Sequence, residues 1–232
     1  MHGDGRSGRY PQPEASRGSQ HWLQLAVEHA PEVLAVPLAA ALGGGPGEIE
    51  WRSPLRRDGF AEYRDRAFLE RLGATLPHRP LESFWPRGGP QWDALATTPS
   101  GGLILVEAKA HLRELGSRCQ ASPASRARIR AALEETAAAT AAGWSDAWLD
   151  GCYQYANRLA HLYLLRVLNG LPAWLALVCF IGDDAMGGPQ TAAEWAGALG
   201  EARRSLRLIP GPLDPFVIDV FPDVREIGRG EG

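Results

Sequence analysis

The segment LILVEAKAHL, residues 103–112, contains Lys109, the only lysine among the 24 lysine and arginine residues of the chain. Glu107 lies two positions earlier, so on a strand both side chains would face the same side of the sheet. Arginine would serve a salt bridge equally well, whereas lysine carries a compact ammonium that can lose its proton when it is desolvated. The single lysine therefore indicates a site in which an ammonium has a chemical role; drift in an arginine-rich composition is the alternative.

Asp93 is a second carboxylate that the sequence brings to the same place. QWDALAT (91–97) and LILVEAKA (103–110) are typical of neighbouring strands, and PSGG between them is a turn signal. Asp93 and Glu107 would then lie on paired strands beside Lys109. Two carboxylates next to one ammonium are costly to bury unless something compensates them, and a divalent cation would do so. A structural salt-bridge cluster on the hairpin is the alternative.

Such a set of side chains could hydrolyse a phosphodiester bond. Mg²⁺ favours oxygen ligands and binds through one or two carboxylates together with water and substrate phosphate. The ion can stabilise charge on a phosphodiester under attack and activate a water, while a nearby ammonium positions that water or stabilises the developing anion. Mg²⁺ or Mn²⁺ is therefore the expected cofactor.

The elements that must position these residues alternate between helical and extended patterns. Helices are expected at 60–73, 125–143, 145–170 and 191–205, with a proline-interrupted helical segment at 21–42. Extended segments are expected at 48–55, 81–85, 91–97, 103–110, 173–181 and 216–221. From the first of these helices to the strand at 173–181 the order is helix, three strands, a helix pair and a strand, which predicts an α/β fold with a mixed sheet.

Composition shifts along the chain predict how it is divided. We expect residues 1–18 to form a disordered tail, 19–47 a helical appendage with a glycine-rich linker, 48–222 the α/β domain and 223–232 a flexible tail. The net charge of −3 gives no support to a protein that coats DNA. Any contact with nucleic acid must therefore come from a local basic patch.

The cysteines and the apolar runs indicate the compartment. Cys119, Cys152 and Cys179 are widely separated and have neither disulfide-framework nor metal-site spacing. The N-terminal residues lack the apolar core of a signal peptide, and the longest apolar run, Ala173 to Ile181, is far shorter than the ~20 residues of a membrane helix. We expect a cytoplasmic protein with no membrane partner.

The residues WD, 13 intervening residues and then EAK after the apolar LILV resemble the core motif of the PD-(D/E)XK nuclease superfamily, which includes many restriction enzymes and archaeal Holliday-junction resolvases. The resemblance covers about residues 59–181 and implies a restriction-endonuclease-like αβββαβ core, with a central mixed sheet flanked by helices. It also implies that Asp93 and Glu107 are metal ligands and that Lys109 is a catalytic base or an electrostatic helper. Trp92 stands where the superfamily has a proline.

The segment GFAEYRDRAFLERLG extends the resemblance upstream. It is similar to the first helix of resolvases and methyl-directed restriction enzymes, which carry a glutamate eleven residues before a closing glycine. Glu62 lies eleven residues before Gly73, so the resemblance assigns the helix glutamate to Glu62, with Glu70 as the second candidate. A solvated helix face is the alternative for Glu62.

A polar stripe lies on the expected helix at 145–170. Its members recur at three- and four-residue steps: Asp150, Gln154, Asn157, Arg158 and His161. In the superfamily this helix packs across the sheet near the metal, so Gln154 and Arg158 are expected to contact phosphate or orient the site. Asn157 and His161 are further candidates for binding substrate. Some exonuclease branches have a tyrosine four residues after the glutamine, whereas Arg158 follows Gln154 here. An exposed helix face is the alternative.

These observations favour a Mg²⁺-dependent endonuclease that hydrolyses DNA. The alternative is a catalytically silent nuclease-fold module that binds nucleic acid or a partner protein, which the net negative charge favours. Many nucleases of this architecture cut two strands as dimers, so the resemblance also allows a homodimer.

Overall fold

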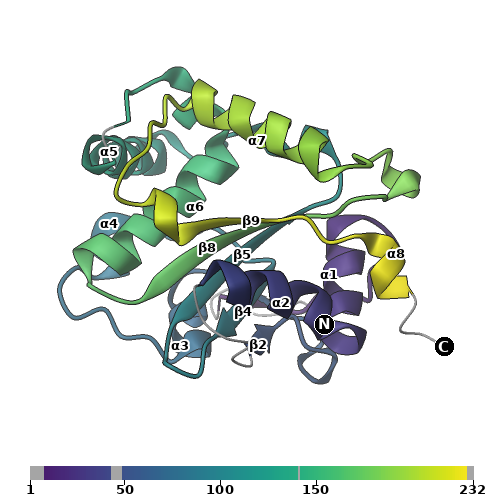
Figure 1. Cartoon of the computed structure of the whole chain (residues 1–232). Helices are drawn as coiled ribbons and strands as arrows, with labels where there is room; N and C mark the ends of the chain where they lie inside the picture. The colour runs from purple at the N-terminus through teal and green to yellow at the C-terminus, as the bar shows by residue number, and fades with distance from the viewer. Residues whose placement is uncertain (1–7, 43–48, 141, 229–232) are drawn as a thin grey trace.

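The computed structural model describes residues 8–42, 49–140 and 142–228. A five-stranded sheet with the order β2-β4-β5-β8-β9 forms its centre (Figure 1). The first two pairings, β2 with β4 and β4 with β5, are antiparallel, and the last two are parallel. The strands are β2 (Glu50–Ser53), β4 (Ala94–Thr97), β5 (Leu103–Lys109), β8 (Ala173–Cys179) and β9 (Val217–Val220). The predicted α/β class with a mixed central sheet and flanking helices is confirmed.

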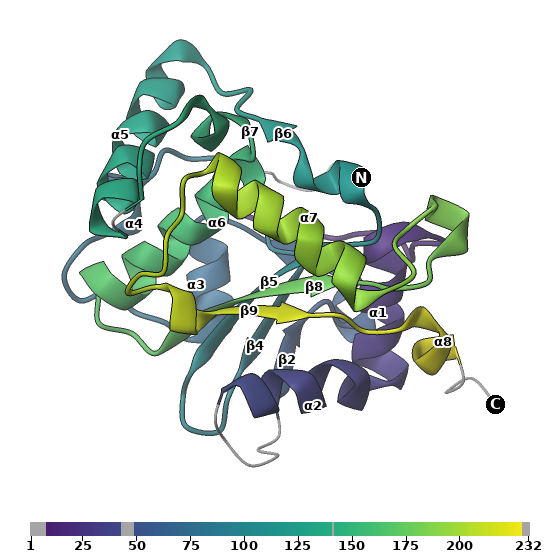
Figure 2. The same ribbon diagram turned by 45° about the horizontal axis from the view of Figure 1, so that its top comes forward.

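One face of the sheet is covered by helices from the two ends of the chain. These are α1 (Gly18–His29), α2 (Pro31–Ala41) and α8 (Val224–Ile227). Figure 2 shows α1 and α2 on the side of the sheet opposite α6 and α7. Leu34 and Leu38 of α2 are fully buried in one cluster with Ile104 of β5. The two helices are therefore part of the core, where the sequence analysis expected an appendage.

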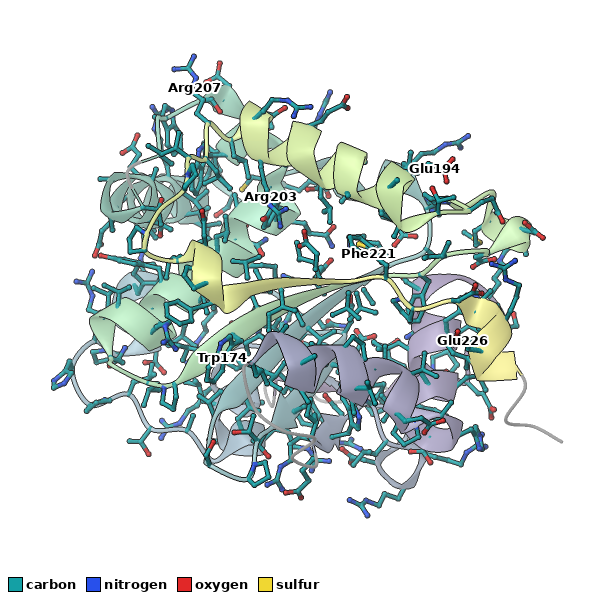
Figure 3. The ribbon with its side chains drawn as sticks, in the orientation of Figure 1. Trp174, Glu194, Arg203, Arg207, Phe221 and Glu226 are labelled. Atoms are coloured by element: carbon teal, nitrogen blue, oxygen red, sulfur yellow. The ribbon has the colours of Figure 1, made fainter. Side chains whose placement is uncertain are left out.

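The other face carries the larger cluster of buried side chains. Its helices are α3 (Arg66–Leu72), α4 (Leu81–Phe84), α5 (Pro123–Ala139), α6 (Tyr153–Tyr163) and α7 (Ala192–Ser205). Phe68, Trp148 and Trp195 are fully buried there. A capping box between Thr191 and Glu194 starts α7, and Figure 3 labels Glu194 on the first turn of this helix.

The alternation of side chains along β5 decides which face of the sheet carries Glu107 and Lys109. Ile104, Val106 and Ala108 belong to the α1–α2 side, whereas Leu103 and Leu105 belong to the α6 side. Because successive strand side chains point to opposite faces, Glu107 and Lys109 continue the second set. Both side chains therefore lie under α6.

Short elements complete the described chain. β1 (Arg9–Tyr10) pairs with β3 (Glu62–Tyr63), and β6 (Ser117–Arg118) pairs with β7 (Asp150–Gly151). Turns of 3₁₀-helix lie at Arg56–Asp58, Leu112–Leu115, Asp146–Trp148, Asp184–Met186 and Asp214–Phe216, and a π-helical segment at Leu164–Leu168 continues α6. No helix in the described ranges is both long and apolar enough to cross a membrane.

The helix expected at 60–73 begins later than predicted. Glu62 and Tyr63 pair with β1, and α3 starts only at Arg66, after Asp65 with φ of 52°. Backbone pairing with a segment about 50 residues away thus overrides a local pattern that is helical. Glu62 is a strand residue, which corrects its assignment to a helix.

Two further elements differ from their predictions. Residues 81–84, expected as a strand, form α4, because Leu81 and Phe84 bury one helical side in the core. The helix expected at 145–170 is interrupted: Trp148 is buried and its Nε1 donates to Leu206 O at 2.9 Å, and the chain then pairs with β6 before α6 begins. The tertiary hydrogen bond of the Trp148 indole therefore keeps residues 145–152 out of the helix, and α6 begins only at Tyr153.

The chain ends are more ordered than expected over the described residues. Arg9 and Tyr10, in the predicted disordered tail, form β1, and Val224 and Ile227, in the predicted flexible tail, are buried in α8. Residues 1–7, the linker at 43–47 and residues 229–232 lie outside the described residues.

Candidate functional site

The β4–β5 hairpin brings Asp93 to Glu107 and Lys109. Ala94 pairs with Val106, so Asp93, one residue before β4, lies opposite the end of β5. Its Oδ2 accepts a hydrogen bond of 2.7 Å from the backbone N–H of Ala108. Asp93, Glu107 and Lys109 thus lie around the backbone N–H of Ala108.

Glu107 lies between two cations. Its side chain is 3% exposed; Lys109 Nζ donates to Oε1, and Arg158 Nε donates to Oε2 at 2.6 Å. Burial by itself would raise the pKa of Glu107, but the charges of Arg158 and Lys109 outweigh it, and the pKa lies below its ordinary value. Glu107 is therefore an ionised carboxylate at neutral pH.

Asp93 and Lys109 respond to the same environment in different ways. Burial, followed by the charge of Glu107, holds the pKa of Asp93 well above its ordinary value. Burial works to lower the pKa of Lys109, yet the charges of Glu107 and Asp93 raise it overall. Lys109 is therefore a cation in this arrangement, which favours the electrostatic role over that of a general base.

Glu62 reaches the site from β3 and is surrounded by glutamine amides. Gln20 Nε2 on α1 donates to Oε1 at 3.2 Å, and Gln12 Nε2 donates to Oε2 at 3.3 Å. Gln91 Nε2 also donates to Oε2. Burial raises the pKa of Glu62, although the amides of Gln91 and Gln20 counteract it. No local pattern marks these glutamines; only Gln91, adjacent to WD, lies within the motif.

Helix α6 supplies the remaining polar residues. Gln154 Oε1 accepts from Lys109 Nζ at 3.3 Å. Arg158 is 3% exposed; besides Glu107 it donates to Gln91 O at 2.7 Å and to Asn157 Oδ1 at 2.9 Å. Arg158 and Asn157 are therefore buried, and the guanidinium of Arg158 is held against Glu107 and Gln91 O rather than exposed to a phosphate.

His161 is a core residue. It is 1% exposed, and its ring lies 4.9 Å from Trp85 and 6.0 Å from Trp92, measured between ring centroids. Nδ1–H donates to Asn157 O at 2.8 Å, and burial lowers its pKa to about 3, so the ring is neutral. Its position corrects the prediction that it contacts substrate. Asp150 leaves the polar stripe as well, because it forms an ion pair with Arg126 at 2.6 Å.

The hairpin, α6 and β3 thus define one charged cluster, in which Glu107, Lys109 and Arg158 are buried and Asp93 and Glu62 are half-buried. No family model, curated protein or solved structure matches the chain. The chemistry of the cluster follows from its donors and charges.

Asp93 and Glu107 are the two carboxylates of the cluster nearest to Lys109, and carboxylate oxygens are the ligands that a hard divalent cation prefers. Mg²⁺ needs only one or two carboxylates, and Asp93 uses one oxygen for Ala108 N, while its Oδ1 accepts no hydrogen bond from the described residues. The same part of the chain contains no group of three or more His, Cys, Asp and Glu side chains arranged to hold a metal. Asp93 and Glu107 would be the oxygen donors to such an ion, and both oxygens of Glu107 already accept from Lys109 and Arg158.

A cavity of about 20 Å³ adjoins Lys109 and Gln154. Glu107 and Glu114 also line it. A space of this size can hold a single water molecule when polar groups surround it. The space beside Lys109 is largely apolar, because much of its remaining lining comes from Leu115, Leu177, Cys179 and Leu199.

Proposed function

We propose that this protein is a metal-dependent nuclease that hydrolyses phosphodiester bonds of DNA at the β4–β5 hairpin. The observation that carries the proposal is the hydrogen bond of 2.7 Å from Ala108 N to Asp93, which holds Asp93 beside Glu107 and Lys109. The order of the longer elements, α1, α2, β2, α3, α4, β4, β5, α5, α6 and β8, supports it, because it resembles the αβββαβ core of restriction-endonuclease-like proteins once α3 and α4 are treated as an insertion between the first two strands.

Asp93 and Glu107 are the residues that would hold Mg²⁺ or Mn²⁺. When bound, such an ion would stabilise charge on the phosphoryl group and lower the pKa of a coordinated water. Lys109, kept as an ammonium by Glu107 and Asp93, would stabilise the negative charge that develops on the phosphate. Gln154 would hold the ammonium in position through its 3.3 Å contact.

The proposal is tested by cleavage of plasmid and labelled oligonucleotides with Mg²⁺ or Mn²⁺. We expect cleavage by the wild type and its loss in Asp93→Asn and Lys109→Ala. Glu201→Gln is the matched control, because that carboxylate is 78% exposed on α7. Absence of cleavage by the wild type, or unchanged cleavage by both site variants, would overturn the proposal.

A second candidate is a silent module that binds nucleic acid or a partner protein. The engagement of both Glu107 oxygens by Lys109 and Arg158 favours it, because these cations already neutralise the carboxylate. Calorimetric titration with Mn²⁺ separates the two: binding that requires Asp93 and Glu107 supports the nuclease, and absence of binding supports the silent module.

The proposal places the protein in the cytoplasm. Cys119, Cys152 and Cys179 are all free thiols and buried, as expected in a reducing compartment. A homodimer, which would present two sites to two strands, is part of the same proposal and is tested by sedimentation velocity.

A further inference from the structure

An arginine-lined groove opens beside the charged cluster. It encloses about 360 Å³ between the start of α3, α4 and the loop that follows α4. Arg64 and Arg66 line one side, and Arg87 lines the other. The sequence analysis did not find this set, because the loop Pro86–Gln91 brings Arg87 to residues more than 20 positions earlier.

The arginines outnumber the carboxylates of the groove, and one carboxylate is already engaged. Asp65 accepts hydrogen bonds from the backbone N–H groups of Gly88 and Gly89, at 3.1 and 2.8 Å. Glu82 is the other acid in the lining. Hydrogen bonds to Asp65 both fix the loop and disperse the negative charge, so the groove retains a positive character.

The arginines of the groove differ in how strongly they already interact with neighbouring side chains. Arg64 lies over the Tyr10 ring at 4.4 Å and 3.7 Å from Asp65. Arg66 forms a 3.2 Å pair with Glu70 in which both side chains are more than 60% exposed, a kind of pair that contributes little. Arg87 is exposed and forms no ion pair within the described ranges. Arg66 and Arg87 can therefore turn toward an anion at small cost.

Two chain segments connect the groove directly to the site. Glu62 and Arg64 are two residues apart on an extended segment, which corresponds to about 7 Å. The loop that carries Arg87 ends at Gln91, which donates to Glu62 and accepts from Arg158. An anionic chain in the groove would therefore continue toward Asp93.

We propose that this groove binds the phosphate backbone of a single-stranded segment of nucleic acid and directs it to the charged cluster. The second part of this inference, that the strand leads to the charged cluster, rests on the proposed nuclease function. A volume of about 360 Å³ is at the lower end of small-molecule pockets, so it admits one or two nucleotides but not the width of a duplex. The aromatic residue of the lining, Trp85, is 2% exposed, so the contact is to phosphate rather than to stacked bases.

Fluorescence anisotropy with a labelled single-stranded oligonucleotide, in EDTA so that cleavage is prevented, tests the inference. We expect tighter binding of the strand than of the matching duplex. Arg66→Ala and Arg87→Ala should each reduce the slope of log affinity against log salt by about 0.7, the value for one phosphate contact on a single strand. Arg204→Ala is the control, because Arg204 is 72% exposed on α7 and lies outside the groove.

The outcomes separate the groove from the nuclease. If the wild type fails to cleave with Mg²⁺ but binding depends on Arg66 and Arg87, the groove stands and the nuclease proposal falls. If the double variant Arg66→Ala/Arg87→Ala binds like the wild type with the same salt slope, if duplex binds more tightly than the strand, or if no strand binds, the groove inference is overturned.

Discussion

Arg158 Nε donates a 2.6 Å hydrogen bond to Glu107 Oε2, and both side chains are less than 5% exposed. Because removal of one partner leaves a buried charge with less compensation, we expect Arg158→Ala to lower the free energy of unfolding by about 3–5 kcal/mol. Arg130→Ala is the matched control: its pair with Glu134 is about half exposed and should cost less than about 1 kcal/mol. Urea denaturation measures both; equal effects would contradict a buried pair.

Lys109→Arg tests whether the ammonium itself is needed. The larger, forked guanidinium cannot occupy the small space beside Glu107 and Gln154, so we expect single-turnover cleavage to fall by about 100-fold or more. Titration with Mn²⁺ serves as the control, because Asp93 and Glu107 are retained and the metal should still bind. Cleavage at the wild-type rate would show that any cation suffices.

Asp93 should release a proton when a metal binds. Its pKa is well above the ordinary value, chiefly because of burial, so a cation that binds this carboxylate competes with a proton up to a higher pH than at an ordinary aspartate. Calorimetry with Mn²⁺ in buffers of different ionisation enthalpy should detect proton release and an affinity that increases with pH. Asp93→Asn removes both effects; proton release that persists in this variant would assign the proton to another group.

His161 should make stability depend on pH. In the folded chain the pKa of His161 is about 3, so the ring stays neutral. In the unfolded chain the ring has its ordinary pKa of 6.5 and takes up a proton when the pH falls below that value. The free energy of unfolding should therefore fall by about 1.4 kcal/mol per unit as pH decreases from 6.5 toward 3. His161→Gln should lack this slope when urea denaturation is compared at pH 7.5 and 5.5; parallel slopes would show that His161 does not cause it.

Leu34 tests whether α2 belongs to the core. Its side chain is fully buried, so Leu34→Ala should destabilise the protein by about 2–5 kcal/mol. Val36→Ala, on the same helix but 61% exposed, should change stability by less than about 0.5 kcal/mol. Thermal denaturation distinguishes the two, and similar small effects would indicate an independently placed appendage.

The sequence by itself determined the hairpin and which of its side chains lie close together. Alternation in β5 puts Glu107 and Lys109 on one face, and a short turn makes Asp93 their neighbour; both are local properties, and the structure has Asp93 bonded to Ala108 N. The helix that crosses this face was predicted too, and Gln154 contacts Lys109 from it.

Only the tertiary structure decided what surrounds those residues. Glu62 became a strand residue because β1 pairs with it, and Gln12, Gln20 and Gln91 reach it from three separate segments. His161 was removed from the site because aromatic rings enclose it. Contacts between distant segments depend on packing and backbone pairing, which local periodicity does not encode. Packing also brings Arg64, Arg66 and Arg87 together in one groove, although they do not form a continuous run of basic residues in the sequence.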